Sequence, residues 1–243
     1  MIFDFTNPWM IALLVILVME NISAYINNPG ALLALVLSIP GILIAITFHE
    51  YAHAFAADKL GDDTPRRQGR LSLNPLAHLD PYGTFLMLFA GFGWGKPVQI
   101  NPNNFRRTIS IKKGEALVSI AGPLMNLILA IVFSIIYGLI LRFGGRFILT
   151  ETGEIISTMI MYTISMNIGL CVFNLIPLPP LDGSKVLLAL LPSKAQVWYE
   201  EHERMLYIVF LVIWLTPISS YIMAPAISAI SNALLKLIRA IAL

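Results

Sequence analysis

The sequence has 243 residues, of which 57% are hydrophobic and 12% charged, and these are too few charges to cover the surface of a water-soluble globule. The net charge of +2 gives no indication of a nucleic-acid partner, because the basic residues lie in short loops between apolar runs. A single cysteine, Cys171, excludes an intramolecular disulfide and a cysteine-based zinc site. The composition therefore predicts a protein of the lipid bilayer.

Long apolar runs predict an all-α polytopic membrane protein with one membrane-embedded domain over residues 1–243. A helix needs about 20 apolar residues to cross a hydrocarbon core of about 30 Å. The first run follows Asp4 without a basic region before it, so we interpret it as a retained span and not as a cleaved signal peptide. Pro217 and Pro225 flank the predicted turn before the last span. The predicted spans are residues 9–26, 31–57, 116–141, 155–176, 205–222 and 224–241.

An apolar, glycine-rich stretch from Tyr82 to Gly95 follows the second span. At about 14 residues it is too short to cross the bilayer as a helix. Basic loops flank it on both sides, which indicates that the chain enters the membrane and returns to the same side. We therefore predict a re-entrant, β-like insertion over residues 82–100.

The basic residues orient these spans. With the insertion treated as re-entrant, fourteen of the sixteen basic residues lie on one side, and only Arg142 and Arg146 lie on the other. Loops rich in lysine and arginine stay in the cytoplasm. The expected location is the cell membrane, with both termini in the cytoplasm. His49 lies 18 residues after Ala31, or about 27 Å along the second helix, and thus near the cytoplasmic face.

His49-Glu50-Tyr51-Ala52-His53 is an HExxH sequence at the end of an apolar run. Histidines four residues apart share one face of a helix, where both can bind one metal ion. Glu50 lies to the side of this pair, within reach of a metal-bound water, which is the general-base position of a zinc hydrolase. The alternative is a chance match, which the intramembrane setting disfavours.

A catalytic zinc site usually has three protein ligands, so a third donor is expected near a span. The candidate acids are Glu20, Glu115 and Asp182. Asp182 is the best placed, because it follows three prolines in four residues, and irregular backbone at membrane depth is tolerated where it lines a cavity. The alternative is a turn or cap residue in an ordinary loop.

Four motifs in order resemble the site-2 protease family of intramembrane zinc metalloproteases. They are the HExxH at 49–53, Asn-Pro-Leu-Ala-His-Leu-Asp-Pro-Tyr-Gly at 74–83, Gly-Pro-Leu-Met-Asn at 122–126 and Asn-x-x-Pro-x-Pro-Pro-Leu-Asp-Gly at 174–183. The resemblance implies one zinc ion bound by His49, His53 and Asp182, with Glu50 activating water. It also implies a six-span core whose site faces the cytoplasm, in a compact member without a PDZ or CBS domain.

Other polar motif residues leave alternatives open. Asn174 either binds substrate or a developing oxyanion, or hydrogen-bonds a neighbouring helix. Asn126 has the same alternatives, and packing between helices is favoured. His78 is expected to be a hydrogen-bonded loop residue and His202 a solvated one. The arginines at 66, 67 and 70 are interpreted as a signal for topology and anionic lipid.

These observations predict an intramembrane zinc endopeptidase that cleaves transmembrane or membrane-proximal segments of other proteins, as in regulated intramembrane proteolysis. A helical substrate must unwind first, and the 82–100 region is a candidate β-edge for it. The alternatives are a membrane zinc transporter and a non-catalytic binder of membrane helices. The oligomeric state stays open, a homo-oligomer included.

Overall fold

The computed structural model describes residues 8–89, 93–214 and 216–243. Its helices are connected by loops and short 3-10 turns, and the described residues contain no strand, only an isolated bridge between Leu79 and Gly95. The prediction of an all-α protein is confirmed. The helices are α1 (Pro8–Asn27), α2 (Pro29–Leu60), α3 (Thr64–Arg67), α4 (Pro81–Phe89), α5 (Ile111–Phe143), α6 (Glu151–Asn174), α7 (Asp182–Leu190), α8 (Ser193–Glu201), α9 (Glu203–Trp214) and α10 (Ile218–Ala242).

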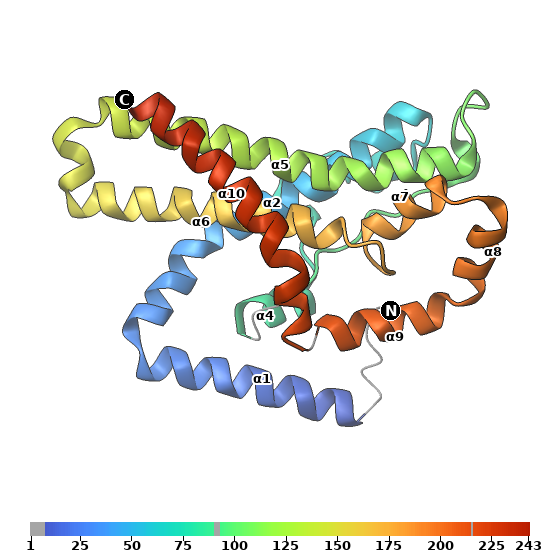
Figure 1. Cartoon of the computed structure of the whole chain (residues 1–243), viewed down its shortest axis with the longest axis horizontal. Helices are drawn as coiled ribbons and strands as arrows, with labels where there is room; N and C mark the ends of the chain where they lie inside the picture. Colours follow the sequence, from blue (N-terminus) through green and yellow to red (C-terminus); the bar gives the residue numbers. More distant parts are fainter. Residues whose placement is uncertain (1–7, 90–92, 215) are drawn as a thin grey trace.

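The long helices α2, α5, α6 and α10 pack into a bundle, with α5 in contact with the other three (Figure 1). Where α2 crosses α6, Gly41 permits a close approach, because a Cβ at this position would lie 2.8 Å from Thr163 Cα. The α1 helix extends away from the bundle and contacts α4, where the Tyr25 hydroxyl donates to the Leu88 carbonyl. The buried residues between α5, α6 and α10 are Ala130, Ile164, Ile168, Val172, Leu234 and Ile238.

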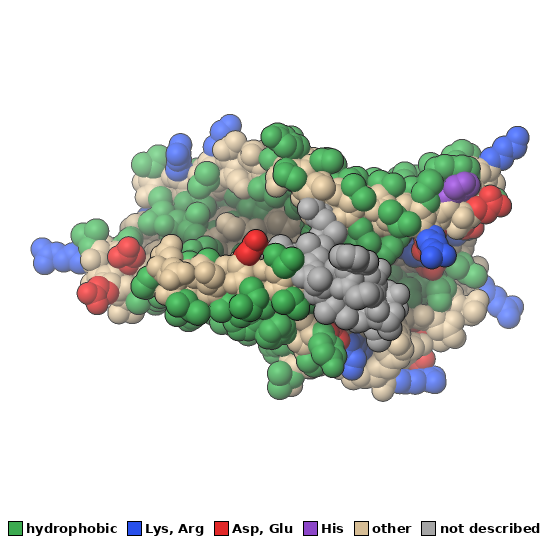
Figure 2. Space-filling view, turned by 90° about the horizontal axis from the view of Figure 1, so that it is seen from below, with side chains coloured by type: hydrophobic (Ala, Val, Ile, Leu, Met, Phe, Trp, Pro, Cys, Tyr) green, Lys and Arg blue, Asp and Glu red, His purple; other side chains and the backbone are tan. Residues whose placement is uncertain are grey.

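Four helices of the described residues, α2, α5, α6 and α10, are long and apolar enough to cross a membrane. On the face that Figure 2 shows, hydrophobic side chains are frequent along the middle, and most charged side chains lie toward the two ends. The last two predicted spans differ from the observed helices. Residues 205–222 do not form one helix, since α9 has 12 residues, about 18 Å, and ends before Pro217. Pro225 instead lies inside α10.

The predicted insertion over 82–100 is β-like only at its bridge. Residues 82–89 belong to α4, and the next described residues, 93–100, run without regular secondary structure apart from Gly95. The main-chain amide of Lys96 donates to the His78 carbonyl at 2.7 Å, beside that bridge. The β-like description is therefore wrong for the α4 part, where apolar residues form a short helix. Whether this segment is re-entrant stays a prediction.

Two buried charged residues connect residues 96–101 to the loops that follow α2. Arg70 is only 3% exposed and donates to the carbonyls of Ala77, Lys96 and Pro97, so it is a structural residue and not part of a surface lipid signal. Asp62 is fully buried and accepts from the Asn101 amide at 2.7 Å. Burial raises the pKa of Asp62, but hydrogen bonds from Thr64, Asn101 and Asn104 outweigh it and hold this pKa below its usual value.

Candidate metal centre and active site

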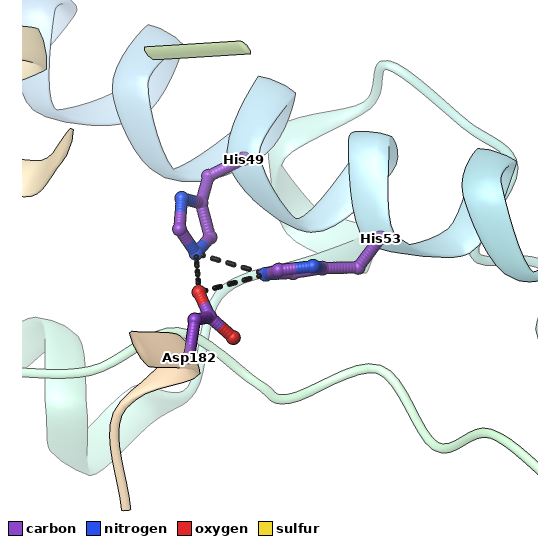
Figure 3. A group of neighbouring side chains, drawn as sticks. All are labelled: His49, His53 and Asp182. Carbon is purple, nitrogen blue, oxygen red and sulfur yellow. Dashed lines mark hydrogen bonds and ion pairs between the residues drawn. The ribbon is translucent and has the colours of Figure 1, made fainter. Parts of the chain in front are cut away.

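Three side chains from two distant parts of the chain meet at one point. His49 and His53 extend from one face of α2, and Asp182 opens α7 directly opposite (Figure 3). The two Nε2 atoms lie 3.0 Å apart, and Asp182 Oδ2 lies 3.2 Å from that of His49 and 3.3 Å from that of His53. Of the described residues, these three form the one group of histidine and carboxylate side chains that could hold a metal ion.

The hydrogen bonds behind the imidazoles determine which nitrogens carry protons. His49 Nδ1 lies 2.6 Å from Asn126 Oδ1, and His53 Nδ1 lies 2.8 Å from the Val118 carbonyl. Since both partners are acceptors, each Nδ1 donates, and a ring in its neutral form then presents an Nε2 lone pair to the centre. Asp182 Oδ2 is buried there and receives no hydrogen bond from the described residues. Three converging lone-pair atoms repel one another unless a cation lies between them, so the donor set fits zinc.

The α5 backbone packs directly on the two imidazoles. A Cβ at Gly122 would lie 2.4 Å from His53 Nε2 and 2.7 Å from His49 Cε1. No side chain fits at this position without moving a histidine. The need for glycine in the Gly122-Pro123 motif was not evident from the sequence, because it depends on which helix packs against α2.

Asn126 lies behind His49 and is fully buried. Its amide nitrogen donates to the Ala45 carbonyl at 3.0 Å and to Asn167 Oδ1 at 2.9 Å. It does not line the cavity that contains Glu50, so the substrate-binding alternative for Asn126 has no support, and packing between helices describes it. Sequence analysis missed Asn167, although a buried amide within a predicted span is a recognisable signal.

Glu50 lines a cavity of about 260 Å³ together with His49, His53 and Asp182. Its Oε2 accepts a hydrogen bond of 3.1 Å from the main-chain amide of Val98. The 93–98 segment reaches this position because Gly95 packs on α2, where a Cβ would lie 2.9 Å from Ile46 Cγ2. The three converging side chains and the expected base thus face one space, with the 93–98 segment along its side.

The turn before α7 positions Asp182. A Cβ at Gly183 would lie 2.4 Å from the Leu175 carbonyl oxygen, so the chain folds back tightly on the end of α6. The Tyr199 hydroxyl supports this turn by donating to the Pro177 carbonyl at 2.9 Å. Burial, and secondarily the charge of Glu203, raise the pKa of Tyr199 to about 12, so this donor stays protonated at neutral pH.

The remaining predicted residues lie outside the three-residue group. Asn174 lines the cavity, but its amide nitrogen donates at 3.0 Å to the Leu170 carbonyl of its own helix. His78 is a buried loop residue whose Nε2 lies 2.6 Å from the Ser72 carbonyl. His202 stacks on Trp198 and bonds its carbonyl. Glu20 and Glu115 do not belong to the described metal-binding group.

Comparison with known proteins gives matches that are all described as peptidases or metalloproteases. Residues 147–217 match the family described as peptidase family M50. "Putative zinc metalloprotease YwhC" of Bacillus subtilis is 41% identical over 201 residues, which cover 82% of this chain and 90% of that protein. "Putative zinc metalloprotease Rip2" is 28% identical in Mycolicibacterium smegmatis and 27% in Mycobacterium tuberculosis H37Rv, each over 75% of this chain and 68% of the relative. No solved structure matches significantly.

Proposed function

Because this chain belongs to the site-2 protease family, peptidase family M50, we propose that it hydrolyses peptide bonds in transmembrane or membrane-proximal segments of other proteins. It is a zinc metalloprotease with membrane-spanning helices. The observation that carries the proposal is that Glu50 shares one cavity with the converging atoms of His49, His53 and Asp182. The relatives give no support to the transporter alternative.

The proposed reaction adds one water across a peptide bond. His49, His53 and Asp182 would hold a single zinc ion, which supplies a Lewis acid that polarises a carbonyl and makes water more acidic. Glu50 takes a proton from the water that attacks the carbonyl carbon. When the carbon–nitrogen bond breaks, Glu50 returns this proton to the nitrogen of the leaving amine. The Val98 amide, which donates to Glu50 Oε2, holds the carboxylate in place for both transfers.

The substrate has to be extended where it is cut, because helical carbonyls are already hydrogen-bonded and shielded. The 93–98 segment lies along the cavity and contacts Glu50, which supports its proposed role as an edge that pairs with an unwound substrate. The fourteen-to-two distribution of basic residues supports a cell-membrane protein with its site and both termini toward the cytoplasm. A site at that face suits regulated intramembrane proteolysis.

The test compares the parent with Glu50→Gln in detergent, with a transmembrane substrate and with or without a chelator. The amide keeps the shape of the side chain and loses its basicity, so zinc content should be unchanged while cleavage falls about 10²–10⁴-fold. The chelator should abolish cleavage by the parent. Equal turnover by both proteins at equal zinc content would refute the proposed role of Glu50.

A further inference from the structure

An apolar groove continues from the active-site cavity along the bundle. It has a volume of about 370 Å³ and lies between α2, α6 and α10, with Ala45, Gly169 and Met223 among its lining residues. The groove and the active-site cavity share lining residues, among them Ile46, Leu170 and Phe173. The groove and the catalytic cavity are therefore neighbouring parts of one surface.

The groove runs toward the membrane interior. Its far end is lined by Ser165 and Met166, both exposed, whereas Asn174 lines the catalytic cavity. Ser165 and Asn174 are nine residues apart on α6, or about 13 Å along the helix. Because α6 is long and apolar enough to span a membrane, the far end opens at membrane depth, where an apolar polypeptide is the expected occupant.

The groove is an open, apolar space that can receive the side chains of an extended segment one at a time. This agrees with the extended form that a peptide must adopt to be cut beside Glu50.

Gly169 is not required by packing. Among the described residues, a Cβ at this position meets no atom within 4 Å, whereas one at Gly41 would lie 2.8 Å from Thr163 and one at Gly122 would lie 2.4 Å from His53. Glycine inside a helix is less stabilising than alanine. Because Gly169 has no side chain, the groove is open at this position. This points to a role for Gly169 in selecting the substrate side chains that the groove accepts.

We propose that this groove receives the apolar, membrane-embedded residues next to the scissile bond, and that Gly169 determines how large a substrate side chain it accepts. The proposal rests on the proposed protease function. Continuity with the catalytic cavity, an apolar lining and room for an extended chain favour such a segment as the occupant.

The test uses Gly169→Leu and Gly169→Ala in the full-length zinc-loaded protein, with Ala233→Leu as the control. Ala233 is exposed on α10 and outside the groove. Each protein is given a transmembrane substrate with leucines beside the scissile bond, the same substrate with alanines there, and a short soluble peptide that lacks the membrane segment.

Gly169→Leu should lower kcat/KM for the leucine substrate at least tenfold, and Gly169→Ala about threefold. The alanine substrate should recover most of the loss, and cleavage of the soluble peptide should stay within twofold of the parent. Ala233→Leu should behave as the parent. An equal loss on all three substrates, or no loss with either Gly169 variant, would overturn the role of the groove. A zinc-loaded parent that cuts none of them would instead refute the protease function.

Discussion

Asn167 lies one hydrogen bond behind Asn126, whose amide nitrogen donates to Asn167 Oδ1 at 2.9 Å while its own Oδ1 faces His49 Nδ1 at 2.6 Å. Asn167 in turn donates to the Thr163 carbonyl at 2.8 Å. This chain runs from α6 through α5 to α2, and all of its side chains are buried. Because Asn167 orients the Asn126 amide, a residue that does not touch the metal centre selects the His49 tautomer.

Asn167→Leu should therefore weaken zinc binding. Loss of a partner that orients a metal-ligating histidine typically costs 10–100-fold in metal affinity or activity. We expect about a tenfold loss of zinc affinity, measured by competition with a chelator. Asn174→Ala serves as the control, because Asn174 bonds only its own helix in the described contacts and should leave this affinity near that of the parent. Unchanged zinc affinity in Asn167→Leu would show that Asn126 needs no support.

Asp182→Ala should lose most of its zinc, because this substitution removes one of three converging donors. Metal analysis of the purified variant is the measurement. Asp182→Asn keeps a neutral oxygen and should retain weak binding. Glu20→Ala and Glu115→Ala are controls that should keep the zinc content of the parent. Full occupancy in Asp182→Ala, with an empty site in either control, would mean that the ligand is assigned to the wrong acid.

Gly122→Ala should disturb the metal centre although it replaces none of the three metal-binding side chains. The added Cβ would lie 2.4 Å from His53 Nε2, closer than atoms can approach without a shift. Zinc content and cleavage should both fall several-fold. Gly169→Ala adds the same methyl group to open space and should retain its zinc. If both variants bind zinc equally well, α5 does not pack on the imidazoles as described.

Membrane orientation can be tested with single cysteines after Cys171→Ser. Cysteines at Ser72 and Ser193 should react with an impermeant reagent only from the cytoplasmic side, because both positions lie among the basic residues assigned to that side. A cysteine at Thr152 should react only from outside. If positions 72 and 193 react from opposite sides, the 82–100 segment crosses the membrane and the re-entrant prediction fails.

The tertiary structure decided features that depend on neighbouring helices. Asn126 had two alternatives in the sequence, and only the position of α5 behind His49 distinguishes them. Likewise, the neighbouring sequence does not show that Gly122 packs on an imidazole while Gly169 faces open space among the described residues. The end of α9 could not be predicted because residues 205–243 are apolar almost throughout, so hydropathy gives no boundary.

Other features follow from the sequence alone because their causes are local. Apolar runs of about 20 residues have to span or pack as helices, since backbone groups in lipid must bond within the segment. The spacing of His49 and His53 places both rings on one face of any helix, wherever that helix packs. Asp182 could be selected as a candidate from its prolines, but only the folded chain brings it within 3.3 Å of His53, because the two are 129 positions apart in the sequence.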